Sequence, residues 1–284
     1  MNGEWEMRNG KWWGMVSPVR VWFYRFTISY FPFTLKCRMH YRIPLLALIL
    51  VATPADAQTV AVDVGHYAGA PGATSARGRA EFEFNLDLAR DIAAALQGEG
   101  LQPRVIGGDG GMVRLSDRSR AARGVALLLS VHHDSVQPHF LQTWVYGGAQ
   151  RLFSDRYAGY SLFISGKNPR QAQSLACASG IGAALQSGGF AHSPHHAERI
   201  AGEMKPYADR RNGVHYYDNL VVLKTAQQAA LLIEAGVIVN RDEELRVADP
   251  AQRRAFARAV AAGGRSCLPR PASALQSGFD RGAD

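Results

Sequence analysis

The sequence predicts an α/β protein: a single domain whose twisted, mostly parallel sheet of about six strands carries helices on both faces. Short, continuous apolar runs recur along the chain, as in strands that are buried on both faces. Segments with helical periodicity lie between several of these runs, and such alternation is typical of a sheet covered by helices. With 284 residues, 47% of them hydrophobic, the chain is long enough for one large domain with a substantial core.

Six apolar runs are predicted to be strands, at residues 59–64, 103–106, 125–131, 160–165, 220–223 and 229–233. Each is short and rich in branched or aromatic side chains, as in "TVAVDV" and "VALLLSV".

Four segments are predicted to be helices, at residues 81–97, 116–122, 171–186 and 251–262. Apolar residues of the first recur at intervals of three and four, namely Phe82, Leu86, Ala89, Ala93 and Leu96. Ser116 is the N-cap expected for the second helix, and Asp249 followed by Pro250 begins the last. Glycine pairs at 188–189 and 263–264 are expected to end the third and the last helix.

The N-terminal region is predicted to be a targeting segment. From Met39 the chain reads "MHYRIPLLALILVATPADA": a short basic region, an apolar stretch too short to span a membrane, and a small-x-small cleavage site. A signal peptide is therefore expected over residues 39–57, with the mature chain beginning at Gln58. Residues 1–38 are then an over-long gene start or, alternatively, an extended basic region. The mature protein is expected to be exported to the periplasm or cell envelope, without a membrane span.

The remainder is predicted to be one catalytic domain over residues 58–264 and a flexible tail over residues 265–284. The net charge is +8, but the first 57 residues contain seven Lys or Arg and three Asp or Glu, which leaves +4 for the rest. So mild a charge indicates no nucleic-acid partner, and it suits a protein that works near anionic polymers of the cell envelope.

Two cysteines remain after the predicted cleavage site, Cys177 in a predicted helix and Cys267 in the tail. In an oxidising compartment such a pair forms a disulfide or remains as two free thiols, and the sequence leaves both open. Neither cysteine has the spacing of a metal-binding motif.

Ligand-type side chains stand beside the ends of predicted strands. His66 follows the first strand, Glu81 opens the next helix, His132 ends the third strand, and Glu234 follows the last. Open α/β sheets bind ligands at such strand ends. Two imidazoles and one carboxylate are typical of a catalytic zinc site, and a second carboxylate can act as general base. Spacing alone leaves open whether each residue is a ligand or a packed structural group.

Four motifs occur in a specific order along the chain. "VAVDVGHYAGAPGATSARGRAEFEFNLDLARDIAAAL" contains a strand, Asp-x-Gly-His, a glycine-rich loop, and Glu before Asn-Leu on a helix. "LSDRSRAA" carries arginine on a helix, "LLLSVHHDS" ends in Ser-Val-His, and "LLIEAGVIVN" runs into Glu-x-Gly and Asn. This set, over residues 59–262, resembles the zinc-dependent N-acetylmuramoyl-L-alanine amidases of the amidase-3 type.

The resemblance implies that His66, Glu81 and His132 bind zinc and that Glu234 is the catalytic glutamate. It also implies the reaction, in which a zinc-activated water hydrolyses the amide between N-acetylmuramic acid and L-alanine in peptidoglycan. This activity would serve cell-wall remodelling, recycling or daughter-cell separation, and peptidoglycan would be the binding partner.

Two neighbouring residues compete with the implied ligands. In the family pattern the ligand precedes Asn-Leu by four and five residues, which selects Glu81 through Asn85 and leaves Glu83 as a solvated carboxylate. His133 adjoins His132, but adjacent strand residues face opposite sides of a sheet. We therefore expect His133 to line the cleft or to pack outside it.

The chain departs from the family pattern at Tyr67, where a small residue is usual, and at Asp134, where Asn is frequent. An aromatic insertion over residues 136–159 is either a hairpin or lid over the substrate groove or a segment folded onto the core. A second insertion contains three histidines that are expected to be exposed in a loop rather than to bind metal: His192, His195 and His196.

Some amidases of this family carry an inserted helix that occludes zinc until a protein activator binds. Glu198 and Glu203 are the candidates for that contact here, which makes an activator a candidate partner.

Two other functions remain as alternatives: a catalytically silent peptidoglycan-binding or regulatory protein on the same fold, and a zinc carboxypeptidase. All four matched site positions are present, which disfavours the first, and carboxypeptidases usually show a different order of ligands.

Overall fold

The computed structural model describes residues 6–8, 11–13 and 58–269 of the chain. Contacts divide the chain into two compact units, residues 1–50 and 51–284. In the first unit, strands β1 (Glu6–Arg8) and β2 (Lys11–Trp13) form an antiparallel pair. The predicted signal peptide over residues 39–57 and most of the predicted tail, residues 270–284, lie outside the described residues.

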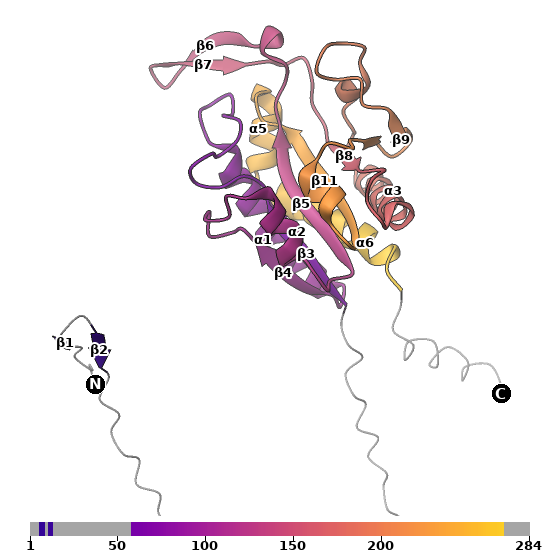
Figure 1. Cartoon of the computed structure of the whole chain (residues 1–284). Coiled ribbons are helices and arrows are strands. Elements are labelled where there is room, and N and C mark those ends of the chain that lie inside the picture. The colour runs from indigo at the N-terminus through magenta and orange to yellow at the C-terminus, as the bar shows by residue number, and fades with distance from the viewer. Residues whose placement is uncertain (1–5, 9–10, 14–57, 270–284) are drawn as a thin grey trace, which may run out of the picture. The chain divides into compact units, whose positions relative to one another are not determined.

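The second unit contains a seven-stranded sheet with the strand order β4-β3-β5-β11-β8-β10-β9 (Figure 1). Its strands are β3 (Thr59–Val64), β4 (Gln102–Ile106), β5 (Leu127–Asp134), β8 (Ser161–Ile164), β9 (Tyr207–Asp209), β10 (Val214–Tyr216) and β11 (Ala229–Val237). β3, β4, β5 and β11 are parallel to one another, whereas β8 pairs antiparallel with β11. The predicted mostly parallel α/β sheet is confirmed, with one strand more than expected.

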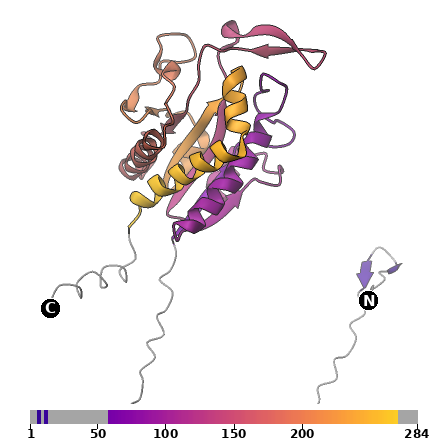
Figure 2. The same ribbon diagram turned by 180° about the vertical axis from the view of Figure 1, so that it is seen from behind.

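Helices cover both faces of this sheet, as predicted. They are α1 (Glu81–Gly98), α2 (Leu115–Ala121), α3 (Gln171–Ser187), α4 (Val221–Thr225), α5 (Arg241–Ala248) and α6 (Pro250–Ser266). α1, α3 and α6 pack on one face, where α1 and α6 lie side by side (Figure 2), and α2 and α4 pack on the other. Successive side chains of β3 point to opposite faces of the sheet, so the strand contributes to both apolar layers. Val62 packs on the α1 side and Ala61 on the α2 side. Within the described residues, no helix is both long and apolar enough to cross a membrane.

The aromatic insertion after β5 forms a hairpin. A short 3₁₀ turn, η1 (Pro138–Phe140), leads into the antiparallel strands β6 (Gln142–Tyr146) and β7 (Ala149–Phe153), which extend away from the main sheet (Figure 1). The connecting residues Gly147 and Gly148 both have positive φ, as a two-residue hairpin turn requires. Trp144 donates a hydrogen bond to the carbonyl of Ala76, at 2.9 Å, which ties the hairpin to the loop before α1.

One predicted strand is wrong. Residues 220–223 belong mostly to helix α4, and the strand of this region is β10, a few residues earlier. Four apolar residues do not distinguish a strand from a helical turn, so tertiary contacts decide. Here the Thr225 hydroxyl bonds both the Val221 carbonyl, at 2.7 Å, and the Ser119 hydroxyl of α2, at 2.8 Å. Docking on α2 therefore selects the helical form.

Helix ends are partly as predicted. Asp249 caps α6 by accepting hydrogen bonds from the backbone of Ala251 and Gln252. Ser116 is not the N-cap of α2, because that helix begins at Leu115.

The last helix runs through its glycine pair instead of ending there. A Cβ on Gly263 would lie 2.4 Å from the Cα of Ile181 in α3, so this glycine permits the close approach of α3 and α6. The helix then continues past the predicted domain boundary at residue 264, and Leu268 is still buried.

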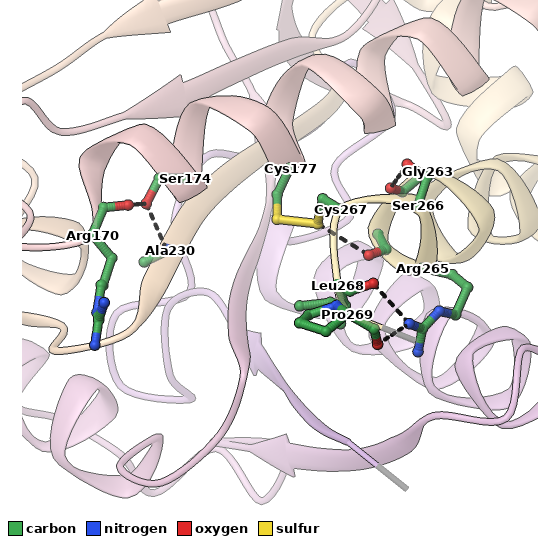
Figure 3. Close-up of a disulfide and its surroundings, with 11 residues drawn as sticks. Arg170, Ser174, Cys177, Ala230, Gly263, Arg265, Ser266, Cys267, Leu268 and Pro269 are labelled. Atoms are coloured by element: carbon green, nitrogen blue, oxygen red, sulfur yellow. Dashed lines mark hydrogen bonds between the residues drawn. A yellow bond between two sulfur atoms is a disulfide. The ribbon is translucent and has the colours of Figure 1, made fainter. Parts of the chain in front are cut away.

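The open question about the cysteines is answered by a disulfide. Cys177 of α3 is bonded to Cys267, the residue after α6, with an S–S distance of 2.06 Å (Figure 3). The bond links residues 90 positions apart. It joins α3 to the end of α6, and beside it Arg265 donates a hydrogen bond to the Leu268 carbonyl, at 2.8 Å (Figure 3).

Candidate active site

The three residues predicted to bind metal meet beyond the carboxyl ends of the central strands. His66 follows β3, Glu81 is the first residue of α1, and His132 lies near the end of β5. His66 Nε2 is 3.0 Å from Glu81 Oε2, and His132 Nδ1 is 3.1 Å from Glu81 Oε1. One donor atom from each residue lies within 4.8 Å of the other two. The topology thus brings the three side chains into one group, while their role as ligands stays a prediction.

Two glycines leave room for this group. A Cβ on Gly65 would lie 2.4 Å from the His132 ring, and a Cβ on Gly72 would lie 2.3 Å from Glu81 Oε2. Gly72 also has φ of +82°, a conformation that other residues rarely adopt. The glycine-rich loop after β3 is therefore shaped by the approach of the ligand-type side chains.

A buried arginine holds the turn that positions His66. Arg118 of α2 is 2% exposed and forms an ion pair with Asp63 of β3, at 2.6 Å. It also donates hydrogen bonds to the backbone carbonyls of Val64 and His66. His66 has φ of 67°, a left-handed conformation that is uncommon outside glycine, so these contacts stabilise an unfavourable backbone geometry.

The partnership of Arg118 and Asp63 was not predicted from the sequence. The available signals were a charged residue inside the apolar run "TVAVDV" and an arginine on the helix "LSDRSRAA". Ser130 of β5 completes the contact by donating a hydrogen bond to Asp63 Oδ2, at 2.8 Å.

Glu81 is held in its ionised form. Burial alone would raise the pKa of Glu81, but hydrogen bonds and charge interactions with His132 and His66 outweigh burial and lower the pKa well below its ordinary range. The amide of Asn85 and the backbone N–H of Ala73 donate further hydrogen bonds to this carboxylate, at 3.2 and 3.0 Å. An ionised carboxylate with fixed oxygens is suited to bind a cation.

The neighbouring residues take the places expected for them. Glu83 is exposed and pairs with Arg79 at 3.1 Å. His133 points to the α1 side of the sheet, is 2% exposed, and hydrogen-bonds Asn85 Oδ1 at 2.8 Å. Burial lowers the pKa of His133 to about 3, so its ring is neutral and Nδ1 is the donor to the Asn85 oxygen.

Glu234 lies beside the group on the adjacent strand. It is the register partner of His132 across the parallel β5–β11 pair, so both side chains leave the sheet on the same face. Its Oε2 atom is buried and has no hydrogen-bond partner among the described residues. Burial, and then the charges of Asp134 and Glu81, raise the pKa of Glu234 well above its usual value. A carboxyl group with a raised pKa beside a cation site is typical of a general acid or base.

The expectation that the three histidines of the second insertion are exposed is wrong. His195 and His196 are 2% and 8% exposed, and both approach Asp134, whereas His192 is only partly buried. Tyr157, from the segment after the hairpin, stacks on His195 with 4.8 Å between ring centroids. The sequence does not show which segments cover an insertion, so this burial could not be predicted.

The two carboxylates considered as occluding groups have partners within their own region. Glu198 accepts a hydrogen bond from the hydroxyl of Tyr157, at 2.6 Å, and Glu203 pairs with His196, at 2.8 Å. Among the contacts of the described residues, neither reaches His66, Glu81 or His132.

Imidazoles and carboxylates gathered at the carboxyl edge of an α/β sheet are compatible with a metal-dependent enzyme. The family model for N-acetylmuramoyl-L-alanine amidase (Amidase_3) matches residues 60–264, and the chain belongs to this family. It is an enzyme that hydrolyses the amide bond between N-acetylmuramic acid and L-alanine in peptidoglycan, which confirms the predicted family and activity. No curated protein sequence matches the chain.

Solved structures show the same fold. The N-acetylmuramyl-L-alanine amidase Ami1 from Mycobacterium smegmatis is similar with a TM-score of 0.58 and 18% identity, over 74% of this chain and 96% of that one. An amidase from Clostridium difficile 630 has a TM-score of 0.55 and 20% identity, over 80% and 99% of the two chains. The CwlD amidase from Clostridioides difficile, solved in complex with the GerS lipoprotein, has a TM-score of 0.55 and 16% identity, over 74% and 98%.

Removing the buried arginine should destabilise the domain strongly. Arg118→Ala leaves Asp63 as an unpaired buried charge, and we expect a loss of about 3–5 kcal/mol in the free energy of unfolding, measured by urea denaturation. Arg120→Ala is the matched control on the same helix, because Arg120 is exposed and pairs with Asp117, and it should cost less than about 1 kcal/mol. Equal effects of the two substitutions would contradict the role given to Arg118.

Proposed function

We propose that His66, Glu81 and His132 hold a zinc ion and that Glu234 is the catalytic carboxylate of this amidase. The observation that carries the proposal is the convergence of three donor atoms within 4.8 Å of one another, from three separate elements. Glu234 supports it, because its buried carboxylate stands in register with His132 and has an unpartnered oxygen in the described structure.

The donor set fits zinc. Imidazole nitrogen and carboxylate oxygen are ligands that zinc accepts readily, and three protein ligands leave one position open. Zinc bonds of about 2.0–2.2 Å in a tetrahedron separate the donor atoms by about 3.3 Å. The contacts of Glu81 with the two imidazoles, at 3.0 and 3.1 Å, are close to that spacing. When bound, zinc lowers the pKa of water toward ~7 and polarises a carbonyl group.

Glu234 moves the proton in the proposed reaction. Its carboxylate accepts a proton from the attacking water, whose oxygen adds to the lactyl carbonyl carbon of N-acetylmuramic acid. Glu234 then returns the proton to the departing nitrogen of L-alanine as the carbon–nitrogen bond breaks. The products are a free carboxyl group on the sugar and a stem peptide with a free amine. The raised pKa of Glu234 favours this exchange, since its protonated form is readily reached.

A protein partner is part of the proposal. The similarity to CwlD, whose solved structure contains the GerS lipoprotein, supports an activator for this chain as well. Full turnover of peptidoglycan by the purified protein alone would exclude such a requirement.

Export to the periplasm or cell envelope is also proposed, with residues 39–57 as the signal peptide. The disulfide between Cys177 and Cys267 supports it, because disulfides persist in oxidising compartments and are rare in the cytosol. We expect protein recovered from the cell envelope to begin at Gln58 by N-terminal sequencing and to show no free thiol by thiol titration. A chain that retains residue 39, or one with two free thiols, would contradict export.

Zinc content should follow the proposed ligands. His66→Ala and His132→Ala should each lower the zinc bound by about one equivalent per chain, since two remaining ligands hold zinc poorly. Glu81→Ala should have the same effect, measured by elemental analysis. Glu83→Ala is the matched control on the same helix, and it should retain all zinc because Glu83 points to solvent. Loss of zinc in the control, or full retention in the other three variants, would refute the ligand assignment.

Glu234→Gln should separate catalysis from metal binding. Glutamine keeps the volume of the side chain but cannot accept the proton, so release of stem peptides from sacculi should fall about 10²- to 10⁴-fold. Zinc content and the urea midpoint should stay near those of the wild type. A fully active variant would refute the mechanism. An inactive variant that has lost zinc would indicate that Glu234 is a ligand instead of a base.

A further inference from the structure

A second group of metal-type ligands lies next to Glu234. Asp134, at the end of β5, faces His195 and His196 of the 3₁₀ turn η2 (His195–Ala197). Oδ2 of Asp134 is 2.8 Å from His196 Nε2 and 3.2 Å from His195 Nε2. One donor atom from each of the three residues lies within 4.8 Å of the other two. None of these residues belongs to the group of His66, Glu81 and His132.

Contacts on the far side of each imidazole direct its Nε2 atom at Asp134. His196 Nδ1 is 2.8 Å from the Glu203 carboxylate, which can only accept, so Nδ1 carries the hydrogen. His195 Nδ1 is 2.8 Å from the Ser193 hydroxyl. Hydrogen bonds of this kind orient the histidine ligands of metal sites and fix their tautomers.

Hydrogen bonding within the protein does not account for both imidazoles. His195 Nε2 is buried and makes no hydrogen bond in the described structure, although it lies only 3.2 Å from Asp134. A doubly protonated His196 would explain its own contacts with Asp134 and Glu203 but would leave His195 Nε2 without a partner. A cation between the three side chains satisfies every one of these atoms.

The surrounding charge favours a cation as well. A cavity of about 230 Å³ is lined by the carboxylates of Asp134, Glu203 and Glu234, together with His196. Lys205 is the ammonium group that lines it, with Nζ 3.8 Å from Glu203 Oε2. Asp134 and Glu203 bring two partly buried negative charges to this cavity, and such charges are costly unless positive charge compensates them.

We propose that Asp134, His195 and His196 form a second site for a divalent transition-metal ion such as zinc. Two imidazole nitrogens and a carboxylate oxygen suit such an ion. Their separations of 2.8 and 3.2 Å approach the spacing of about 3.3 Å between donors on tetrahedral zinc. The site adjoins the cavity that Glu234 lines, and it goes beyond the proposed amidase mechanism, which needs only the first group.

Zinc stoichiometry tests the second site directly. Chelator-treated protein is reloaded with Zn²⁺, freed of excess metal by gel filtration and analysed by elemental analysis. The wild type should hold two equivalents per chain, while His66→Ala and His196→Gln should each hold one and the double variant none. His139→Gln is the matched control, because His139 is exposed and belongs to neither group, and it should hold two.

A thermal measurement makes the test independent of how well the His196 variant folds. Added Zn²⁺ should raise the melting temperature of His66→Ala, which retains the second site, because a ligand that binds only the folded state stabilises it. The rise should vanish in His66→Ala/Asp134→Asn, since asparagine preserves volume and accepts hydrogen bonds but is a poor zinc ligand.

Three results would overturn the second site. The first is one equivalent of zinc in the wild type together with none in His66→Ala. The second is two equivalents of zinc in a folded His196→Gln variant. The third is a melting temperature of His66→Ala that added zinc does not change. Failure of the amidase mechanism is distinguishable from these, because it would be seen as activity that survives in Glu234→Gln.

Discussion

The buried contact between Arg118 and Asp63 is the interaction on which the active-site arrangement depends. A guanidinium carries five N–H donors in a rigid fork, so one side chain can pair with the carboxylate of β3 and also hold the backbone carbonyls of Val64 and His66. The chain turns sharply there, and His66 adopts a left-handed conformation. The direction of the His66 imidazole toward Glu81 therefore follows from a charge pair located beneath the site.

The surroundings of Glu81 and Glu234 shift the pKa values of the two carboxyl groups in opposite directions. Glu81 faces two imidazoles that more than offset its burial and keep it ionised, whereas Glu234, with a buried Oε2 atom, lies near other carboxyl groups and has a raised pKa. Opposite shifts of two nearby carboxyl groups are the physical basis for giving one the role of ligand and the other the role of proton carrier. Asp134 contacts His195 and His196, and these three residues form the second proposed cation site beside the first.

Much of the fold was predictable because its signals are local. The strand at residues 59–64 and the helix that begins at Glu81 follow from apolar runs and periodicity, and both occur as predicted. The meeting of His66 and His132 was predictable for a related reason, since parallel strands bring their carboxyl ends to one edge. The strand expected at residues 220–223 failed, because so short a segment takes its conformation from the α2 surface on which it docks.

The sequence by itself determined the alternation of layers, the family, and the identity of the ligand-type residues at the strand ends. Only the tertiary structure decided that Cys177 pairs with Cys267, that Arg118 lies against Asp63, and that two loop histidines are buried against Asp134. The two residues of each pair are separated by 55 to 90 positions in the sequence. The ring of Tyr157 also stacks on His195, one of the two loop histidines. Periodicity shows which face of an element is apolar, but it carries no information about which distant segment covers that face. Which segment covers it depends on the fold of the whole chain.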